Sequence, residues 1–473
     1  MPDVQQLVNP RIGNGRIDEV RLAFLRWLAS GDARKESLIR TYRDYYDGEH
    51  ATQLTARMRA FLSIAANIEF NLNFMPIPVD VLKERMTVVG FDAAAPQGGE
   101  EGIFWQWWQV NRMDGVQKGV HLANFRDGDT FVIVGWDNER NMPTFDHNLA
   151  YDGTSGVRVF YQEEDRHQVD YAFKLWRIEE EDLANAGYGR RLNVYTADAI
   201  YKYRSDSRFA EGAWGPVIET DGAGNQLPWP IPWVGEAGQP LGVAVVPFRN
   251  NPCGYTDGTS ELHDLIPVQN ALNKLIVDEL MAADVESFGM ITKAGGGDPA
   301  SITVAPRSIL YDPDPETTWD QIPASDFAGI RALVKDYIMR IAQISRTPLS
   351  YFQVTGQISS SETQKADDTG LVSKAEDRSV DIGNSWEDCM ILARRLHNAF
   401  AEGPELDEGE RIETQWASFE RVDKLQTEER RSNTALNLVK AGATPRGAFK
   451  AAGYNDEQVT ELVGSRLLRQ DEV

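Results

Sequence analysis

The sequence has 473 residues, which is too long for one ordinary hydrophobic core and suggests about three domains. Its 42% hydrophobic and 25% charged residues exclude a chain that is disordered over most of its length. The 72 acidic and 48 basic residues give a formal net charge of -24, which argues against a protein that grips duplex DNA through a basic face.

Cysteine usage and hydropathy exclude further classes. Two cysteines, Cys253 and Cys389, imply no disulfide framework and fit a reducing compartment. The first residues lack the basic and apolar regions of a signal peptide, so none is expected. The longest apolar runs, 131–136 and 241–248, are too short to span a bilayer and predict buried strands instead. We therefore expect no membrane partner.

The first 125 residues are predicted to be mainly helical. Apolar residues at helical spacing indicate helices over residues 18–30 and 34–46 and a shorter helix over 81–85. Residues 90–102 are rich in Ala, Pro and Gly and predict a loop, after which a helix is expected to end near Phe125.

Residues 126–250 change in character and predict a mixed or antiparallel sheet. Runs rich in β-branched and aromatic residues alternate there with turn residues. The proline-rich stretch 228–233 is expected to be a rigid, extended surface segment. The predicted strands are 130–136, 157–161, 171–177, 192–196, 200–203 and 243–248.

Two regular helices with an insertion between them follow. The first is predicted from Gly258 to about Ser287, with Pro267 either kinking it or lying in its first turn. The second is predicted from Ser325 and ends before Pro348. The stretch between the two helices has several prolines and three consecutive glycines, and predicts a small β-containing insertion with strands near 301–304 and 308–311.

An irregular loop and a very long helix come next. Ser361 can cap a helix that runs to about Glu402, roughly 60 Å if unbroken, with Gly370 and Gly383 as its weak points. An acidic stretch then precedes three predicted helices, at 421–440, 445–452 and 455–468.

Most catalytic and cofactor motifs are absent from the sequence. It contains no phosphate-binding GxxxxGK[ST] loop, no GxGxxG after a strand and no GxSxG nucleophile elbow. Its six histidines are scattered and form no metal-ligand pattern with the cysteines. We therefore predict no cofactor, no metal and no enzymatic activity.

Two features leave a carboxylate-dependent hydrolase open as an alternative. Asp127 and Asp129 flank a glycine and could act as paired carboxylates, although a solvated turn is the favoured interpretation. Trp105, Trp107 and Trp108 could form a sugar platform beside acidic catalysts, although packing at the start of a helix is favoured.

An ordered set of short sequence words runs along the chain: Tyr45-Tyr-Asp-Gly48, residues 71–91, Gly128-Asp129, Val246-Pro-Phe248 with Asn250 and Gly254, Gly258-Thr-Ser-Glu-Leu262, residues 266–274, Ile344-Ser-Arg-Thr-Pro-Leu349 and Ser359-Ser-Ser-Glu362. In this order, the words resemble phage portal proteins, most closely those of phages of Gram-positive hosts. The resemblance extends over most of residues 40–400, and the set is more specific than any single word.

The resemblance implies an α+β, predominantly helical portal-type fold. Its parts would be a wing, a stem hairpin of two helices with a small clip between them, a tunnel loop, a long helix and a helical crown. They would occupy residues 1–255 (wing), 256–287 (first stem helix), 288–324 (clip), 325–347 (second stem helix), 348–361 (tunnel loop), 362–403 (long helix) and 404–473 (crown).

The resemblance also implies a function and partners. A dodecameric ring at one capsid vertex would be the channel for double-stranded DNA during packaging and ejection, and its acidic wall would let DNA slide. It would dock the terminase motor, the major capsid protein, and later head completion (adaptor) and tail proteins. We expect it in the virion, and in the host cytoplasm during assembly. Another structural or adaptor protein of the virion head is an alternative.

Candidate contact residues follow from the same resemblance. The predicted tunnel loop would face DNA through Gln353, Val354, Gln357, Ser359 and Ser360, and residues 349–361 contain no Lys or Arg that could hold a phosphate. A plain connector is the alternative for this loop. In the predicted clip, Lys293 and Arg307 are candidates for contact with a partner or DNA, with scattered surface charge as the alternative.

Overall fold

The structure is a computed structural model of the whole chain. It divides into two compact units, one of residues 1–360 and 367–417 and one of residues 361–366 and 418–473. The residues that the structure describes are 33–50, 72–93, 101–162, 165, 168–178, 189–205, 214–220, 224–252, 257–288, 291–294, 318–321, 327–352, 361–420 and 424–452.

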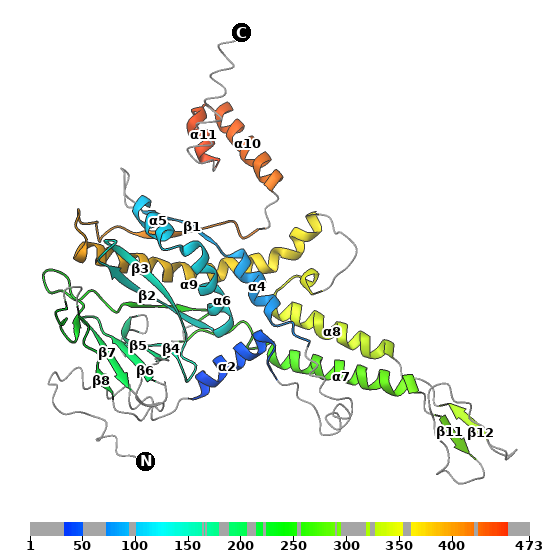
Figure 1. The fold of residues 1–473 in the computed structure, drawn as a ribbon. Coiled ribbons are helices and arrows are strands. Elements are labelled where there is room, and N and C mark those ends of the chain that lie inside the picture. Colours follow the sequence, from blue (N-terminus) through cyan, green and yellow to red (C-terminus); the bar gives the residue numbers. More distant parts are fainter. Residues whose placement is uncertain are drawn as a thin grey trace. The chain divides into compact units, whose positions relative to one another are not determined.

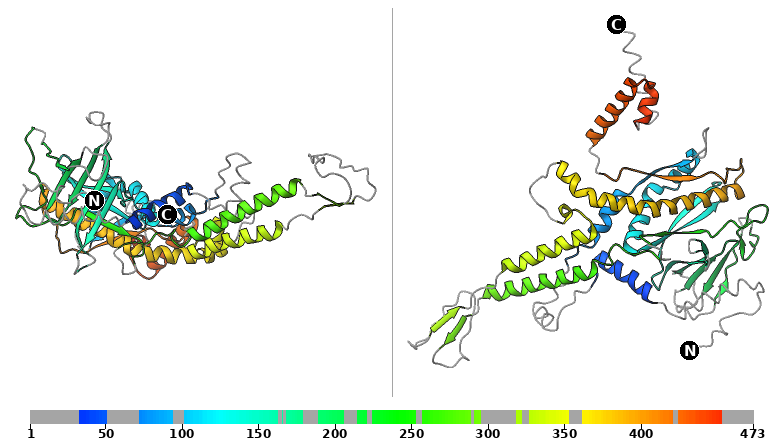
Figure 2. Two further views of the ribbon diagram at one scale, coloured as in Figure 1. Left: turned by 90° about the horizontal axis from the view of Figure 1, so that it is seen from below. Right: turned by 180° about the vertical axis from the view of Figure 1, so that it is seen from behind.

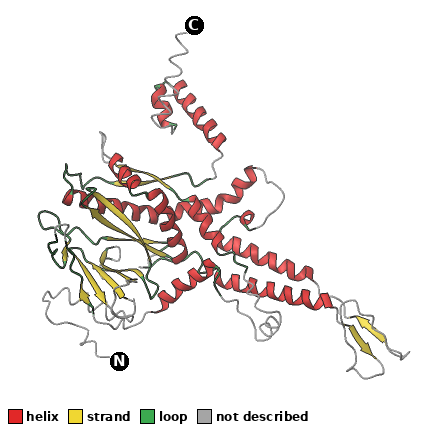
Figure 3. Ribbon diagram, viewed as in Figure 1, coloured by secondary structure: helices red, strands yellow, loops and turns green. Residues whose placement is uncertain are grey.

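Helices and strands are mixed, so the predicted α+β class is confirmed. Helices make up 46% and strands 25% of the structure, so the prediction of a predominantly helical fold holds only roughly (Figure 3). Among the described residues no helix is both long enough and apolar enough to cross a membrane.

Among the described residues, the first unit begins with the helices α2 (Ala33–Asp47), α4 (Pro76–Arg85), α5 (Glu101–Val110) and α6 (Met113–Asp127). Trp108 of α5 is fully buried, and Trp107 is 4% exposed. Their burial confirms packing as the role of these two tryptophans. Helix α6 ends at Gly128, whose φ of 89° is a conformation that a side chain would strain.

A three-stranded antiparallel sheet lies beside these helices in the order β10–β2–β3. The strands are β2 (Asp129–Asp137), β3 (Met142–Leu149) and β10 (Val245–Arg249). Pro247, which has no N–H, is tolerated because β10 is an edge strand. The predicted strands 130–136 and 243–248 are confirmed, whereas β3 was not expected.

A second antiparallel sheet contains β4 (Gly156–Tyr161), β5 (Val169–Ile178), β6 (Gly189–Tyr195), β7 (Ala199–Ser205), β8 (Gly215–Pro216) and β9 (Ile231–Pro232). Phe173, Leu175 and Leu192 belong to its buried core. The prediction that 228–233 is a surface segment is wrong in part. Trp229 packs against this core and donates to the carbonyl of Lys202, and Trp233 is 7% exposed.

Helix α9 (Ser361–Phe400) is one continuous helix of 40 residues, despite Gly370 and Gly383. A β ribbon of β1 (Val88–Ala93) and β13 (Ile412–Trp416) lies near it, and a Cβ on Gly383 would be 3.4 Å from Nε1 of Trp416. Strand β13 was not expected, because only helices are predicted after the acidic stretch in residues 404–473.

An αα-hairpin with a two-stranded tip completes the first unit. Helices α7 (Ile266–Phe288) and α8 (Phe327–Ser345) lie side by side, and β11 (Ile291–Ala294) pairs with β12 (Thr318–Gln321) beyond them (Figures 1 and 2). Pro267 lies in the first turn of α7, as one of its two predicted positions required. The strands predicted at 301–304 and 308–311 fall outside the described residues. A 3-10 turn, η3 (Leu349–Tyr351), follows α8.

The second unit contains a short helical hairpin of α10 (Lys424–Lys440) and α11 (Pro445–Ala451). Gly442 turns the chain between them with a φ of 96°. Ala435 and Ala448 are completely buried. The predicted helices 421–440 and 445–452 are confirmed, and the one at 455–468 lies outside the described residues.

Candidate functional site: the helical hairpin and its anchorage

The stretch that leads into α7 is attached to the end of α6 by residues from three distant parts of the chain. The backbone N–H of Gly258 donates to Oδ1 of Asp129 (2.8 Å), and Thr259 donates to the carbonyl of Asn250 (2.7 Å). The Asn250 N–H donates in turn to the carbonyl of Gly128 (2.8 Å). These residues come from three of the portal-like words, so the words encode one backbone junction.

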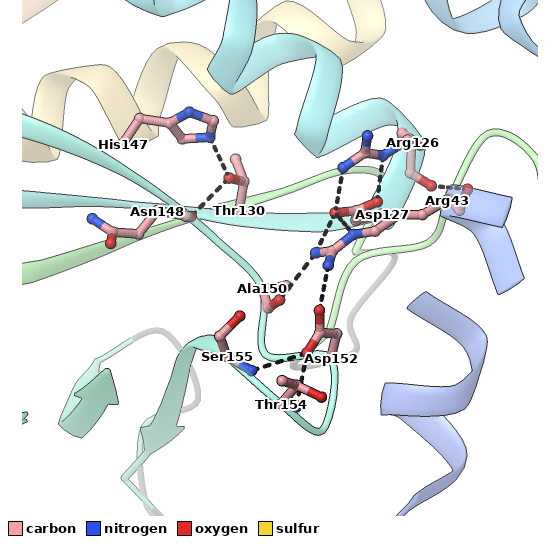
Figure 4. A network of polar contacts seen from close by, with 11 residues as sticks. Arg43, Arg126, Asp127, Thr130, His147, Asn148, Ala150, Asp152, Thr154 and Ser155 are labelled. Atoms are coloured by element: carbon pink, nitrogen blue, oxygen red, sulfur yellow. Dashed lines mark hydrogen bonds and ion pairs between the residues drawn. The ribbon is translucent and has the colours of Figure 1, made fainter. Parts of the chain in front are cut away.

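Asp127 lies in a buried charge network at this junction (Figure 4). Its side chain is completely buried and accepts from Arg43 (2.8 Å) and Arg126 (2.7 Å). Arg43 also pairs with Asp152 at 2.8 Å and donates to the carbonyl of Ala150. Buried carboxylates require such partners, because an unpaired charge in the interior is costly.

The carboxylate of Asp129 is also buried and paired with a cation. Its side chain is 4% exposed and is paired with Lys35, which also pairs with Asp257. The interpretation of Asp127 and Asp129 as a solvated turn is therefore wrong, because both side chains are buried. Cations already pair with both carboxylates, and no group of three or more potential metal ligands occurs among the residues that the structure describes.

A buried ion triad joins the stretch just before α7 to α9. Glu261 pairs with Lys374 at 2.6 Å and with Arg378 at 2.9 Å, and the Glu261 and Lys374 side chains are 8% and 6% exposed. Burial alone would raise the pKa of the Glu261 carboxyl, but the charges of Lys374 and Arg378 outweigh it and lower that pKa to about 2.

The same lysine fixes the end of α8. Nζ of Lys374 donates at 3.0 Å to the backbone carbonyl of Ser345, the last residue of that helix. A cation at a helix C-terminus satisfies a carbonyl that has no partner within the helix. Lys374 therefore binds both ends of the hairpin, the approach to α7 and the exit of α8, to one point on α9.

A second contact holds the chain on both sides of the 353–360 segment. Arg85 of α4 pairs with Asp368 of α9 at 2.7 Å, and both side chains are less than 10% exposed. The same nitrogen of Arg85 also donates to the hydroxyl of Tyr351, at 3.4 Å. Because Tyr351 precedes this segment and Asp368 follows it, Arg85 brings both flanks of the segment to one place.

The backbone carbonyl of Leu72 and the side chains of Tyr45 and His50 hold the first turns of α7. Nε2 of Gln269 donates to the carbonyl of Leu72, and the hydroxyl of Tyr45 donates to Asn270 at 2.7 Å. Asn273 contacts Nε2 of His50 at 3.2 Å. Burial lowers the pKa of His50, which keeps its imidazole neutral.

Most of the residues predicted to contact DNA or a partner lie outside the described residues. Gln353, Val354, Gln357, Ser359 and Ser360 lie outside the described residues. Arg307 lies outside them as well. Lys293 lies in β11, where its Cα is paired with that of Trp319. Sequence reasoning missed the anchoring residues Arg85, Glu261 and Lys374, although Arg85 and Glu261 lie within portal-like words.

The hairpin, its β tip and its attachment to a long helix form a scaffold, and comparison with known proteins defines its class. The chain belongs to the phage portal proteins. The matching family is described as "Phage portal protein, SPP1 Gp6-like", and its model matches residues 25–433. This is a structural family and the chain is not an enzyme.

Two curated relatives carry the name "Portal protein". The one from Mycobacterium phage D29 is 22% identical over 437 residues, which cover 88% of this chain and 80% of that protein. The one from Mycobacterium phage L5 is 23% identical over 410 residues, covering 81% and 76% respectively. The resemblance to portals of phages of Gram-positive hosts is thereby confirmed.

Proposed function

We propose that this chain forms a closed ring at one vertex of a tailed phage capsid, and that DNA passes through the ring during packaging and ejection. The family match over residues 25–433 is the observation that carries this proposal. Phage portal proteins form homo-oligomeric rings in the virion that interact with the capsid, DNA and terminase. A scaffold of packed helices with buried ion pairs suits such a structural role.

The parts of the chain are assigned as follows within this proposal. Residues 256–287 and 325–347 are the stem helices, residues 288–324 are the clip between them, and residues 1–255 are the wing. The hairpin of α7 and α8 and the pairing of β11 with β12 support the order helix, β insertion, helix. Residues 362–403 are the long wing helix, and residues 404–473 are the crown.

Residues 348–361 are the tunnel loop in this assignment. The contact of Arg85 with Tyr351 and Asp368 supports it, because a loop that faces moving DNA needs fixed ends. The absence of Lys and Arg from residues 349–361 leaves only weak contacts to the phosphates. Gln353, Val354, Gln357, Ser359 and Ser360 are the proposed DNA-facing residues.

The partners and the stoichiometry belong to the same proposal. The ring has twelve copies and assembles in the host cytoplasm. Its clip, with Lys293 and Arg307, docks terminase and later the head completion and tail proteins, while the major capsid protein surrounds the ring. Negative-stain microscopy of the purified chain tests the ring itself. Closed rings with a central hole are expected, and a chain that remains monomeric at micromolar concentration would contradict the proposal.

A further inference from the structure

The buried face of the second sheet ends in a row of polar residues. Residues that pair across neighbouring strands point to the same face of a sheet, so they form rows. The rows of β5, β6 and β7 on this face are Phe173, Val194 and Tyr201, then Leu175, Leu192 and Tyr203, then Arg177, Arg190 and Ser205. The hydrophobic core of this sheet therefore stops at two arginines.

The guanidinium of Arg190 is buried without a counter-ion. Arg190 is 7% exposed, and its Nε atom has no hydrogen-bond partner. Among the described residues no carboxylate pairs with it, and Tyr151 and Arg177 are the only ionisable groups that act on it. Burial lowers the pKa of Arg190, Tyr151 offsets part of this effect, and the like charge of Arg177 adds to it. A charge in this state is costly, because it has lost water and gained no anion.

A third arginine approaches the same end of the sheet from α2. Arg40 is exposed, and its guanidinium carbon would lie 3.9 Å from a Cβ on Gly153. The hydroxyl of Tyr151 lies within electrostatic reach of both Arg190 and Arg40. No ion pair of the described residues involves Arg40 or Arg177. Guanidinium groups from α2, β5 and β6 therefore gather here in a chain whose net charge is -24.

The carboxylates near Tyr151 already have cationic partners. Glu36 pairs with Arg158 at 3.2 Å, and Asp152 pairs with Arg43 at 2.8 Å. Both carboxylates act on the pKa of Tyr151, but neither acts on that of Arg190. The positive charge at this end of the sheet is therefore not balanced by these two carboxylates.

We propose that Arg40, Arg177 and Arg190 bind an oxyanion, either a phosphate ion or the carboxylate of a glutamate side chain from another protein. A planar guanidinium donates two parallel hydrogen bonds to such groups, and the anion offsets the cost of burying Arg190. Duplex DNA is not the ligand, because its backbone cannot bring a phosphate to a side chain that is 7% exposed. The site lies in the proposed wing and does not depend on the proposed ring.

Thermal unfolding of the full chain tests for the ligand. Sodium phosphate or triglutamate is titrated at constant pH, with sodium chloride adjusted to hold the ionic strength constant. A ligand that binds the folded state should raise the melting temperature by several degrees and in a saturable manner. A rise at lower concentration with phosphate identifies a phosphate ligand, whereas a rise at lower concentration with triglutamate identifies an acidic protein segment. No rise with either probe beyond that in chloride would overturn the inference.

Two methionine substitutions locate the site. Arg190→Met should abolish the ligand-dependent rise, and in chloride it should melt no lower than the native chain, since it removes a buried charge that lacks a counter-ion. Arg40→Met should raise the half-saturating concentration several-fold without changing the melting temperature in chloride, because Arg40 is exposed. Arg411→Met is the matched control, with a side chain that is 83% exposed, and should respond like the native chain. A full response of Arg190→Met, or its melting below the native chain in chloride, would contradict the inference.

Carboxylates of the same chain are the competing source of an anion. The sequence Glu179-Glu-Glu-Asp182 follows β5 and lies outside the described residues. A chain that carries Glu179→Gln, Glu180→Gln, Glu181→Gln and Asp182→Asn together should show the same ligand-dependent rise as the native chain. A rise confined to this variant would mean that these carboxylates already fill the site, and it would rule out an external ligand.

Discussion

The indole nitrogen of Trp386 donates a hydrogen bond of 3.1 Å to Nε2 of His121 in the interior of the first unit. Since Nε2 accepts, the proton of this neutral imidazole lies on Nδ1, which is 3.3 Å from the carbonyl of Met86. Three segments meet at this ring: α6, α9 and the end of α4. His121 is completely buried, and burial lowers its pKa to about 3.

The first prediction concerns the pH dependence that this histidine causes. Between about pH 6.5 and pH 3 the unfolded chain binds a proton at residue 121 that the folded chain excludes. The free energy of unfolding should therefore fall as the pH drops, by about 1.4 kcal/mol per pH unit from this group. His121→Gln can keep both hydrogen bonds without titrating, so urea unfolding should show a shallower slope between pH 7.5 and pH 5. An unchanged slope would mean that His121 is not held neutral.

The second prediction concerns the ion triad at the start of α7. Glu261→Gln leaves the buried Lys374 and Arg378 without their anion and should cost about 3–5 kcal/mol at neutral pH. The folded pKa of about 2 lies below the ordinary value of 4.5 for a glutamate, so the contribution of Glu261 is complete above about pH 4.5 and is lost as the pH falls towards 2. The difference between variant and native chain should shrink over that range.

Glu413→Gln is the matched control for the triad. Glu413 pairs with Arg411 on the surface, where their side chains are 62% and 83% exposed, so its loss should cost less than about 0.5 kcal/mol. Urea unfolding of both variants at pH 7 makes the comparison. Equal losses would show that burial does not strengthen the Glu261 pairs.

The third prediction contrasts two glycines. A Cβ on Gly258 would overlap the backbone oxygen of Gly128, so Gly258→Ala must displace the start of α7 and should cost about 1–3 kcal/mol. The nearest atoms to a Cβ on Gly370 are 4.0 Å away, in Arg346, so Gly370→Ala should stabilise α9 by roughly 0.5–1 kcal/mol. Thermal unfolding should move the two melting temperatures in opposite directions. A rise for both would show that Gly258 is not in close contact.

The fourth prediction concerns the proposed tunnel loop. Deletion of residues 354–359 removes most of the segment whose flanks Arg85 holds, and none of the described contacts involves those residues. Rings should still form, but DNA packaging or retention should fail in an in vivo complementation assay. Loss of ring assembly would assign the segment a structural role instead.

Regular patterns made much of the fold predictable. The runs of β-branched and aromatic residues at 157–161 and 171–177 correspond to β4 and β5, and the regular helix predicted from Ser325 to before Pro348 corresponds to α8. Strand β3 was missed because its sequence, MPTFDHNL, has few β-forming residues, and its pairing with β2 compensates for them. Strand β13 was missed because its partner, β1, lies more than 300 residues away in the chain.

The anchorage was beyond prediction from the sequence for a similar reason. Asp129 was interpreted as part of a solvated turn because its partner Lys35 is 94 residues away in the sequence. The triad joins Glu261 to Arg378 across 117 residues, and no local pattern marks such a pair. The ordered portal-like words did include Asp129 and Glu261. They predicted the family of the chain, but not which side chains these two carboxylates contact.

Electron cryo-microscopy of the purified, assembled chain tests the central claim most directly. We predict a closed ring in which residues 348–361 face the central channel. A ring whose channel is lined by other residues would contradict the assignment of the loop. A particle without a continuous channel would contradict the proposed passage of DNA itself.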